Sequence, residues 1–173
     1  MAKLCLQTRG TIISESELNI RRIGDPAVFW SSFAGVGFIP VAPGTWGTVA
    51  AVFVWWFGLS HLAVPFIVIF LLAYLGLSVW AADVVQRRYG VKDAGLVVSD
   101  EAAGMWIALI GVPKIWWMVL IAFAAFRLLD IWKPGPIGYF DRELDGGFGV
   151  MADDVLAGVI VALGAIVIQI TLS

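Results

Sequence analysis

Two pairs of adjacent acids stand beside apolar stretches of this chain, and a glycine follows each pair one helical turn later. These residues are Asp100, Glu101 and Gly104, and Asp153, Asp154 and Gly158. Small residues allow helices to approach closely, so the four carboxylates could gather around one point. Carboxylates that gather in this way repel one another unless a cation lies among them. Their oxygen atoms suit a hard divalent cation such as Mg²⁺, and we predict these four acids as its ligands.

A third polar segment follows another apolar stretch and carries both signs of charge. Arg127 and Asp130 are three residues apart and therefore share one face of a helix, and Lys133 follows them. Arginine can bind phosphate through two parallel N–H donors, and lysine adds a positive charge. Arg127 and Lys133 are therefore predicted to bind a substrate phosphate. Asp130 is predicted as a further metal ligand or as the base that activates water. We predict Asp130 and Asp154 as the catalytic pair.

The segment Pro43-Gly44-Thr45-Trp46-Gly47-Thr48 precedes the first strongly apolar stretch. Backbone N–H groups at a helix start form an anion site, and glycine lets the anion approach the backbone. The hydroxyl groups of Thr45 and Thr48 would add donors, so both are predicted to contact the substrate phosphate.

Each of these features also has a purely structural explanation. Asp100 and Asp153 could cap helices, and Asp130 could simply pair with Arg127. Arg127 and Lys133 could anchor helices at a membrane surface, and the Pro-Gly-Thr run could be an ordinary turn. Their joint occurrence favours a functional site, because ionisable groups near a membrane interior are costly to maintain.

The single histidine, His61, is expected on the far side of the membrane, away from these acids, and the single cysteine, Cys5, in the N-terminal extension. Neither has a neighbouring partner that would activate it as a nucleophile, so a phosphohistidine or phosphocysteine intermediate is not expected. Attack by water with the help of a metal ion remains the reasonable route.

Composition places these residues in a membrane protein. Hydrophobic residues make up 61% of the chain and charged residues 14%, and the mean hydropathy is +0.93. Soluble domains carry about 25% charged residues, so the excess apolar surface needs a bilayer as its cover. No basic run indicates a nucleic-acid partner. We predict an all-α polytopic membrane bundle with short or broken helices and a site that faces the cytoplasm.

Five apolar segments are expected to form the bundle, at residues 48–60, 62–82, 102–112, 115–129 and 155–172. A full crossing needs about 20 residues, so the third segment is too short to span alone. Residues 1–32 are predicted as a cytoplasmic or interfacial extension without a cleavable signal peptide, and residues 33–173 as the membrane-embedded domain.

Alternating segments place almost all charge on one side of the membrane. The chain would turn on the far side at His61 and at Pro113-Lys114, which leaves ten of the eleven Lys and Arg residues on the near side. All thirteen Asp and Glu residues also fall on the near side. The positive-inside rule then assigns the near side to the cytoplasm.

At these residues the chain resembles the phosphatidylglycerophosphatase A family of bacterial inner membranes, from about Phe33 to the C-terminus. The matching stretches are Pro43-Gly44-Thr45 with Gly47, Asp100-Glu101 with Gly104-Met105-Trp106, Arg127 with Asp130 and Lys133-Pro134, Asp141-Arg142, and Asp153-Asp154 with Ala157-Gly158. The resemblance implies Mg²⁺-dependent removal of the terminal phosphate from the phospholipid phosphatidylglycerophosphate, which yields phosphatidylglycerol.

Other classes of function stay open at this stage. Buried acids also line ion paths, so a transporter or channel for a cation or phosphate is the main alternative, although the far half of the bundle lacks polar residues to continue a path. A phosphatidyl-transferase could use the same metal chemistry. A purely structural membrane protein would leave the acids unexplained.

Overall fold

The computed structural model describes residues 20–89, 94–135, 137–139 and 146–172, and in these ranges the regular secondary structure is helical, without strands. The α-helices are α1 (Pro26–Ser31), α2 (Pro43–Phe57), α3 (Val64–Tyr89), α4 (Ser99–Leu109), α5 (Trp116–Trp132) and α7 (Gly146–Leu172). Short 3-10 helices cover Ile20–Gly24, Val36–Phe38 and Leu59–His61. The predicted all-α class is confirmed.

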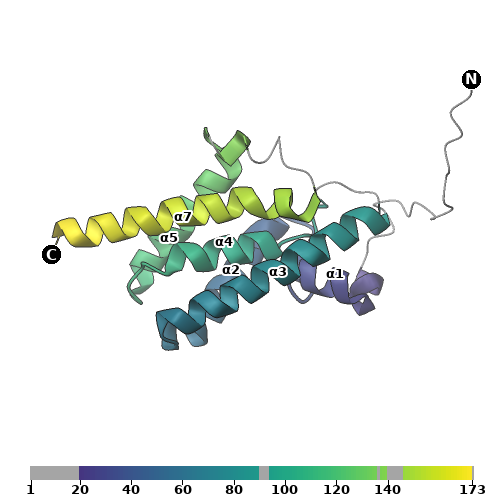
Figure 1. Cartoon of the computed structure of the whole chain (residues 1–173), viewed down its shortest axis with the longest axis horizontal. Helices are drawn as coiled ribbons and strands as arrows, with labels where there is room; N and C mark the ends of the chain where they lie inside the picture. Colours follow the sequence, from purple (N-terminus) through teal and green to yellow (C-terminus); the bar gives the residue numbers. More distant parts are fainter. Residues whose placement is uncertain (1–19, 90–93, 136, 140–145, 173) are drawn as a thin grey trace, which may run out of the picture.

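The short helix α4 forms the centre of the bundle, with α7, α2, α3 and α5 packed around it (Figure 1). Its 11 residues measure about 16 Å, roughly half the thickness of a bilayer's hydrocarbon core. Nearly all of its side chains are buried, including Met105 and Trp106. The segment expected at residues 102–112 is therefore an internal helix that begins three residues earlier and does not reach across a membrane.

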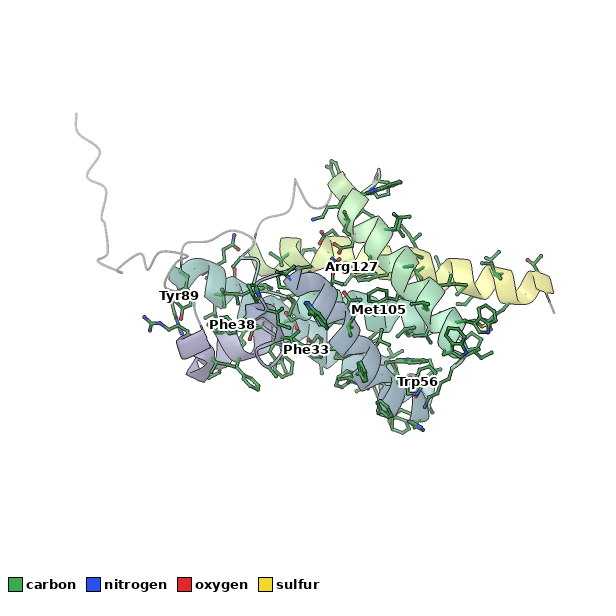
Figure 2. All side chains as sticks on the ribbon, turned by 180° about the vertical axis from the view of Figure 1, so that it is seen from behind. Phe33, Phe38, Trp56, Tyr89, Met105 and Arg127 are labelled. Carbon is green, nitrogen blue, oxygen red and sulfur yellow. The ribbon has the colours of Figure 1, made fainter. Side chains whose placement is uncertain are left out.

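Two of the described helices, α3 and α7, are long and apolar enough to cross a membrane. Both present large apolar side chains on their outer surfaces, such as Phe66 and Leu72 on α3 and Ile168 on α7. The helices α2 and α5 have 15 and 17 residues and measure about 22 and 25 Å, which is shorter than the hydrocarbon core. In Figure 2, Tyr89 lies at one end of the molecule, and Trp56 lies toward the other but short of the C-terminal end of α7.

Two further helices, like α4, begin earlier than the apolar pattern predicts. α2 begins at Pro43, so the Pro-Gly-Thr run is its first turn, and proline is well suited to that position because its missing N–H needs no partner there. α7 begins at Gly146, nine residues before the predicted start, although its first residues are rich in glycine. Packing overrides the weak helix propensity of glycine here: a Cβ at Gly147 would overlap the backbone of Val79 in α3.

Aromatic side chains fill the space between α4 and its neighbours. The Trp106 ring contacts Tyr74 and Phe70 of α3, with ring centroids 4.8 and 5.3 Å away, and the ring of Phe33. Its indole Nε1 donates a hydrogen bond of 2.8 Å to the carbonyl of Ala51 in α2. The ring therefore joins α2, α3 and α4 while its polar atom is satisfied.

The N-terminal helix α1 lies within the predicted extension and packs against α3. Ala27 and Val28 of α1 are buried against α3, and Asp25, which caps α1, forms an ion pair with Arg88. Cys5 lies outside the described residues.

The two turns expected on the far side lie together in the structure. The Nζ atom of Lys114 is 3.1 Å from Nε2 of His61 and 5.4 Å from the centroid of the Trp56 ring. We call this group of three side chains the far end of the bundle.

Candidate functional site

A cavity of about 270 Å³ opens at the end of the bundle opposite His61 and Lys114, and five acids line it. Its charged and polar lining residues are Gln86, Asp100, Glu101, Asp130, Lys133, Asp153 and Asp154. They come from α3, α4, α5 and α7 and from the residue after α5. We call this space the acid cavity.

Asp100 and Glu101 reach the acid cavity from the first turn of α4, where the helix dipole favours negative charge. Asp100 does not cap α4, because the capping position belongs to Val98; its Oδ1 accepts a hydrogen bond of 3.0 Å from the N–H of Glu101. Both acids precede the apolar part of α4. Burial raises the pKa of Asp100 well above its ordinary value, and the charge of Glu101 raises it further. Burial also raises the pKa of Glu101.

Asp153 and Asp154 reach the cavity from inside α7, about two turns after its start, so neither caps a helix. They meet the α4 acids because the two helices touch at glycines. A Cβ at Gly104 would lie 2.6 Å from the carbonyl oxygen of Asp154, and a Cβ at Gly158 would overlap the carbonyl of Gly104. The close approach inferred from these two glycines is present in the structure.

The carboxylates form two groups that a metal ion could use. Ligand atoms of Asp100, Glu101 and Asp154 all lie within 4.8 Å of one another, and the same holds for Asp130, Asp153 and Asp154. The structure thus brings the four predicted metal ligands and Asp130 into one place, from segments far apart in the chain.

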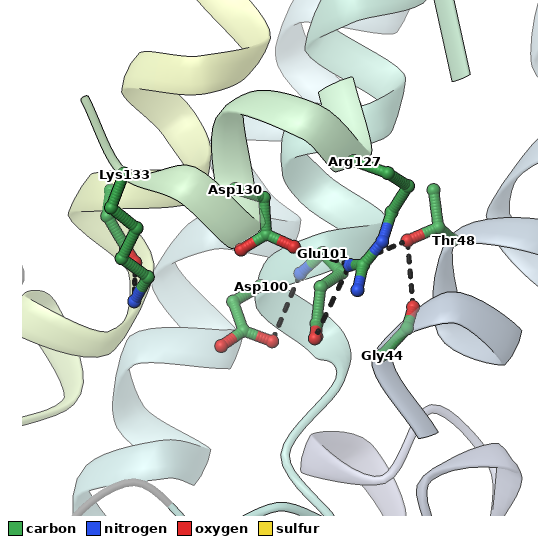
Figure 3. A network of polar contacts seen from close by, with 8 residues as sticks. Gly44, Thr48, Asp100, Glu101, Arg127, Asp130 and Lys133 are labelled. Atoms are coloured by element: carbon green, nitrogen blue, oxygen red, sulfur yellow. Dashed lines mark hydrogen bonds and ion pairs between the residues drawn. The ribbon is translucent and has the colours of Figure 1, made fainter. Parts of the chain in front are cut away.

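Arg127 joins three helices beside this group (Figure 3). Its Nη1 atom lies 2.5 Å from Oδ2 of Asp130 and 3.9 Å from Oε1 of Glu101. The same atom donates a hydrogen bond of 3.4 Å to the hydroxyl of Thr48, which in turn donates one of 2.8 Å to the carbonyl of Gly44. Among the described residues, Arg127 is not part of the cavity lining; it orients two of the acids that are.

Lys133 is the cationic side chain among the described residues that line the cavity. It ends α5 in a left-handed conformation with φ of 44°, which costs a non-glycine residue about 1–2 kcal/mol. The following Pro134 disfavours a further helical turn at this position. Its Nζ atom lies 2.7 Å from Oδ2 of Asp153, so the end of α5 is tied to α7.

The first turns of α2 contribute fewer side chains to the acid cavity than the sequence predicts. Gly44 lines the cavity, and a side chain there would overlap the carboxylate of Glu101, so the glycine admits that acid. Thr48 is fully buried and holds Arg127 instead of facing the cavity. Thr45 is half-buried and is not among the described lining residues. The helical form of this run explains the difference, because the Thr48 hydroxyl bonds the carbonyl four residues back.

The acids fit a hard divalent cation. The Oε2 atom of Glu101 and the Oδ1 atom of Asp154 are buried without a hydrogen-bond partner. Leaving a charged oxygen buried and unsatisfied is costly, so these atoms call for a cationic ligand. The donor set consists of carboxylate oxygens, which magnesium prefers.

Gln86 of α3 is a lining residue that the sequence did not reveal. The apolar pattern of this segment stops at residue 82, whereas α3 continues to Tyr89 and carries Gln86 to the cavity. Asp141 and Arg142, which belong to the matching stretches, lie outside the described residues.

Comparison with known proteins gives consistent matches. The family model described as Phosphatidylglycerophosphatase A matches residues 29–169. The chain is 42% identical over 131 residues to phosphatidylglycerophosphatase A of Escherichia coli (strain K12), with 74% of each chain covered. It is 41% identical over 136 residues to the protein of the same name from Haemophilus influenzae, covering 78% of this chain and 83% of that protein.

A third relative carries a different name. A protein of Bacteroides thetaiotaomicron, named provisionally as a phosphatidylinositol-3-phosphatase, is 39% identical over 145 residues, which cover 78% of this chain and 87% of that protein. No solved structure gives a significant match.

Proposed function

The chain belongs to the phosphatidylglycerophosphatase A family, and from this premise we propose that it removes the terminal phosphate of phosphatidylglycerophosphate to give phosphatidylglycerol. It is accordingly a phosphatase that hydrolyses a phosphoric monoester, and the product would enter phospholipid biosynthesis. One observation carries the proposal at the level of the site: three buried acids, two partly buried acids and a lysine meet in one cavity at the charged end of an apolar helical bundle.

The position of the acid cavity suits a lipid phosphate. The outer surfaces of α3, α5 and α7 are apolar, so the diacylglycerol part of a phospholipid would stay in the bilayer beside them. The headgroup would then enter the polar cavity at the membrane surface. We propose that Lys133 binds the phosphate there, because its Nζ faces the cavity and carries a positive charge.

We propose Mg²⁺ as the cofactor, held by Asp100, Glu101, Asp153 and Asp154. When bound, it would neutralise phosphate charge and help orient water for attack on phosphorus. Asp130, whose carboxylate Arg127 holds by the 2.5 Å ion pair, is either a further metal ligand or the group that accepts a proton from that water. The new bond joins the water oxygen to phosphorus, and the bond between phosphorus and the glycerol oxygen breaks.

We further propose that the protein lies in the bacterial inner membrane as a multi-pass protein with the acid cavity facing the cytoplasm. The charge asymmetry of the chain supports this orientation. The contact between His61 and Lys114 supports it too, because it unites the two turns assigned to the opposite face.

The test is phosphate release by the full chain, purified in detergent, on three substrates: phosphatidylglycerophosphate, phosphatidylinositol 3-phosphate and soluble glycerol 3-phosphate. We expect the highest kcat/KM on the first, loss of activity with a chelator, and recovery when Mg²⁺ is added back. Full activity in the chelator would contradict the cofactor, and a higher kcat/KM on either other substrate would contradict the assigned headgroup.

A further inference from the structure

The two groups of carboxylates in the acid cavity have one member in common, Asp154. We infer that the five acids form two cation sites that share Asp154, with Asp100 and Glu101 completing the first and Asp130 and Asp153 the second. The inference rests on the proposed function, since it assigns the cation of that reaction to these residues.

The surroundings of Asp154 suit a shared ligand. Only 3% of this residue is exposed, and its Oδ1 atom has no hydrogen-bond partner in the described structure. The glycine contact between α4 and α7 brings its backbone against Gly104, and its carboxylate lies within 4.8 Å of ligand atoms of both acids of α4 and of Asp130 in α5. A carboxylate with an unsatisfied buried oxygen is stabilised by contact with a cation.

The two sites differ in the positive charge that they already contain. The second group includes Asp130, which is paired with Arg127, and Asp153, which is paired with Lys133 at 2.7 Å. In the part of the chain that the structure describes, the ion pair printed for the first group is the one between Arg127 and Glu101, at the longer distance of 3.9 Å. We therefore expect the first site to bind a divalent cation more tightly than the second.

The charge of the acid cavity also favours two ions over one. Among residues 20–89, 94–135, 137–139 and 146–172, five carboxylates gather beside two cationic side chains, Arg127 and Lys133, so these described groups carry three more negative than positive charges. One divalent cation would leave the cavity negative and repel an incoming phosphate. Two would make it positive and attract the phosphate.

The experiment counts bound Mn²⁺, which replaces Mg²⁺ in oxygen-ligand sites and is visible by electron paramagnetic resonance. The full chain is purified in detergent, freed of metal with a chelator, and titrated with Mn²⁺ while the signal of the unbound ion is recorded. We expect about two ions per chain, the first bound at least about tenfold more tightly, and an exchange-coupled spectrum at saturation. A single bound ion, or two ions without exchange coupling, would overturn the inference.

Three substitutions assign the sites. Glu101→Gln is expected to abolish the tighter binding event and Asp153→Asn the weaker one, each leaving about one ion. Asp154→Asn is expected to weaken both events and remove the coupling. Asp83→Asn is the matched control, because Asp83 belongs to α3 and pairs with Arg87; it should keep both ions. Equal loss of one event in the Glu101 and Asp153 variants would also overturn the inference.

Phosphate release measured on the same samples separates this inference from the proposed function. One bound Mn²⁺ with full phosphatase activity would contradict the two sites that share Asp154 and would still support the proposed function. Two exchange-coupled ions without activity on any phospholipid would contradict the proposed function and would still support the pair of cation sites. The wild-type count decides the first question even where a variant fails to fold.

Discussion

At the far end of the bundle Lys114 meets His61 and the face of Trp56, whereas at the other end five of the described acids line one cavity with Lys133. Both ends gather polar side chains from segments distant in the chain. Only one of them leaves buried charged oxygens without a partner, on Glu101 and Asp154.

This difference in hydrogen bonding distinguishes polar groups that stabilise the fold from polar groups that are suited to bind a ligand. The far-end contact links the turn after α2 to the turn before α5 and is largely exposed to solvent, so it needs nothing further. The acid cavity is partly buried, and its described lining residues include more negative than positive side chains, which a stable protein tolerates only where binding offsets the cost. The predictions below test this contrast, in order of decreasing effect.

Asp154→Asn should have the largest effect, because it removes the acid common to both carboxylate groups. We expect kcat for phosphate release to fall by at least about 100-fold. Asp83→Asn, the same change at an acid outside the cavity, should keep kcat within about twofold of wild type. The assay is phosphate release at saturating substrate. Equal losses in the two variants would show that position in the cavity does not matter.

Gly158→Ala should disturb the contact between α4 and α7. The added Cβ would overlap the carbonyl of Gly104, so the helices must separate and the two acid pairs with them. We expect a loss of about 1–3 kcal/mol in stability and reduced activity. Gly164→Ala on the same helix is the control, because its Cβ would meet nothing within 4 Å. Thermal unfolding in detergent measures both; a lower Tm for Gly164→Ala than for Gly158→Ala would contradict the packing explanation.

Arg127→Lys keeps the charge but replaces the guanidinium group whose Nη1 atom reaches Asp130, Glu101 and Thr48. Because Arg127 orients two acids of the cavity, we expect kcat to fall by roughly 10–100-fold while the protein stays folded. Arg87→Lys, in an exposed pair with Asp83, should leave the rate unchanged. A change confined to KM would instead assign Arg127 to direct binding of the phosphate.

Lys114→Ala should have the smallest effect, since it lies at the far end in an exposed contact. We expect a change in stability below about 0.5 kcal/mol and unaltered kinetics. Thermal unfolding and the phosphatase assay on the same preparation measure both. A large loss of activity would mean that the far end is coupled to the cavity, and the contrast between the two ends would fail.

The helix bounds predicted from the apolar pattern differ from the observed bounds where tertiary packing extends a helix. The apolar pattern located the helices at residues 62–82 and 115–129 to within a few residues at most ends, because a continuous apolar run is itself the signal. The pattern missed the first nine residues of α7, because glycines and acids interrupt the apolar run there. It also missed the last seven residues of α3, because these are largely polar. Contacts between these two helices, at Gly147 against Val79, make up for the poor local preference.

The sequence by itself determined the all-α class, the identity of the acids and the glycines beside them, because residue type and spacing carry that information directly. Only the tertiary structure decided what the residues around the acids do. Thr48 contacts Arg127, and Arg127 holds acids in place. Lys133 and Gln86 line the cavity. The tertiary structure also made Asp154 the member common to both carboxylate groups. The physical reason is that side-chain direction at a helix end depends on where the helix starts and stops, and tertiary contacts set those points.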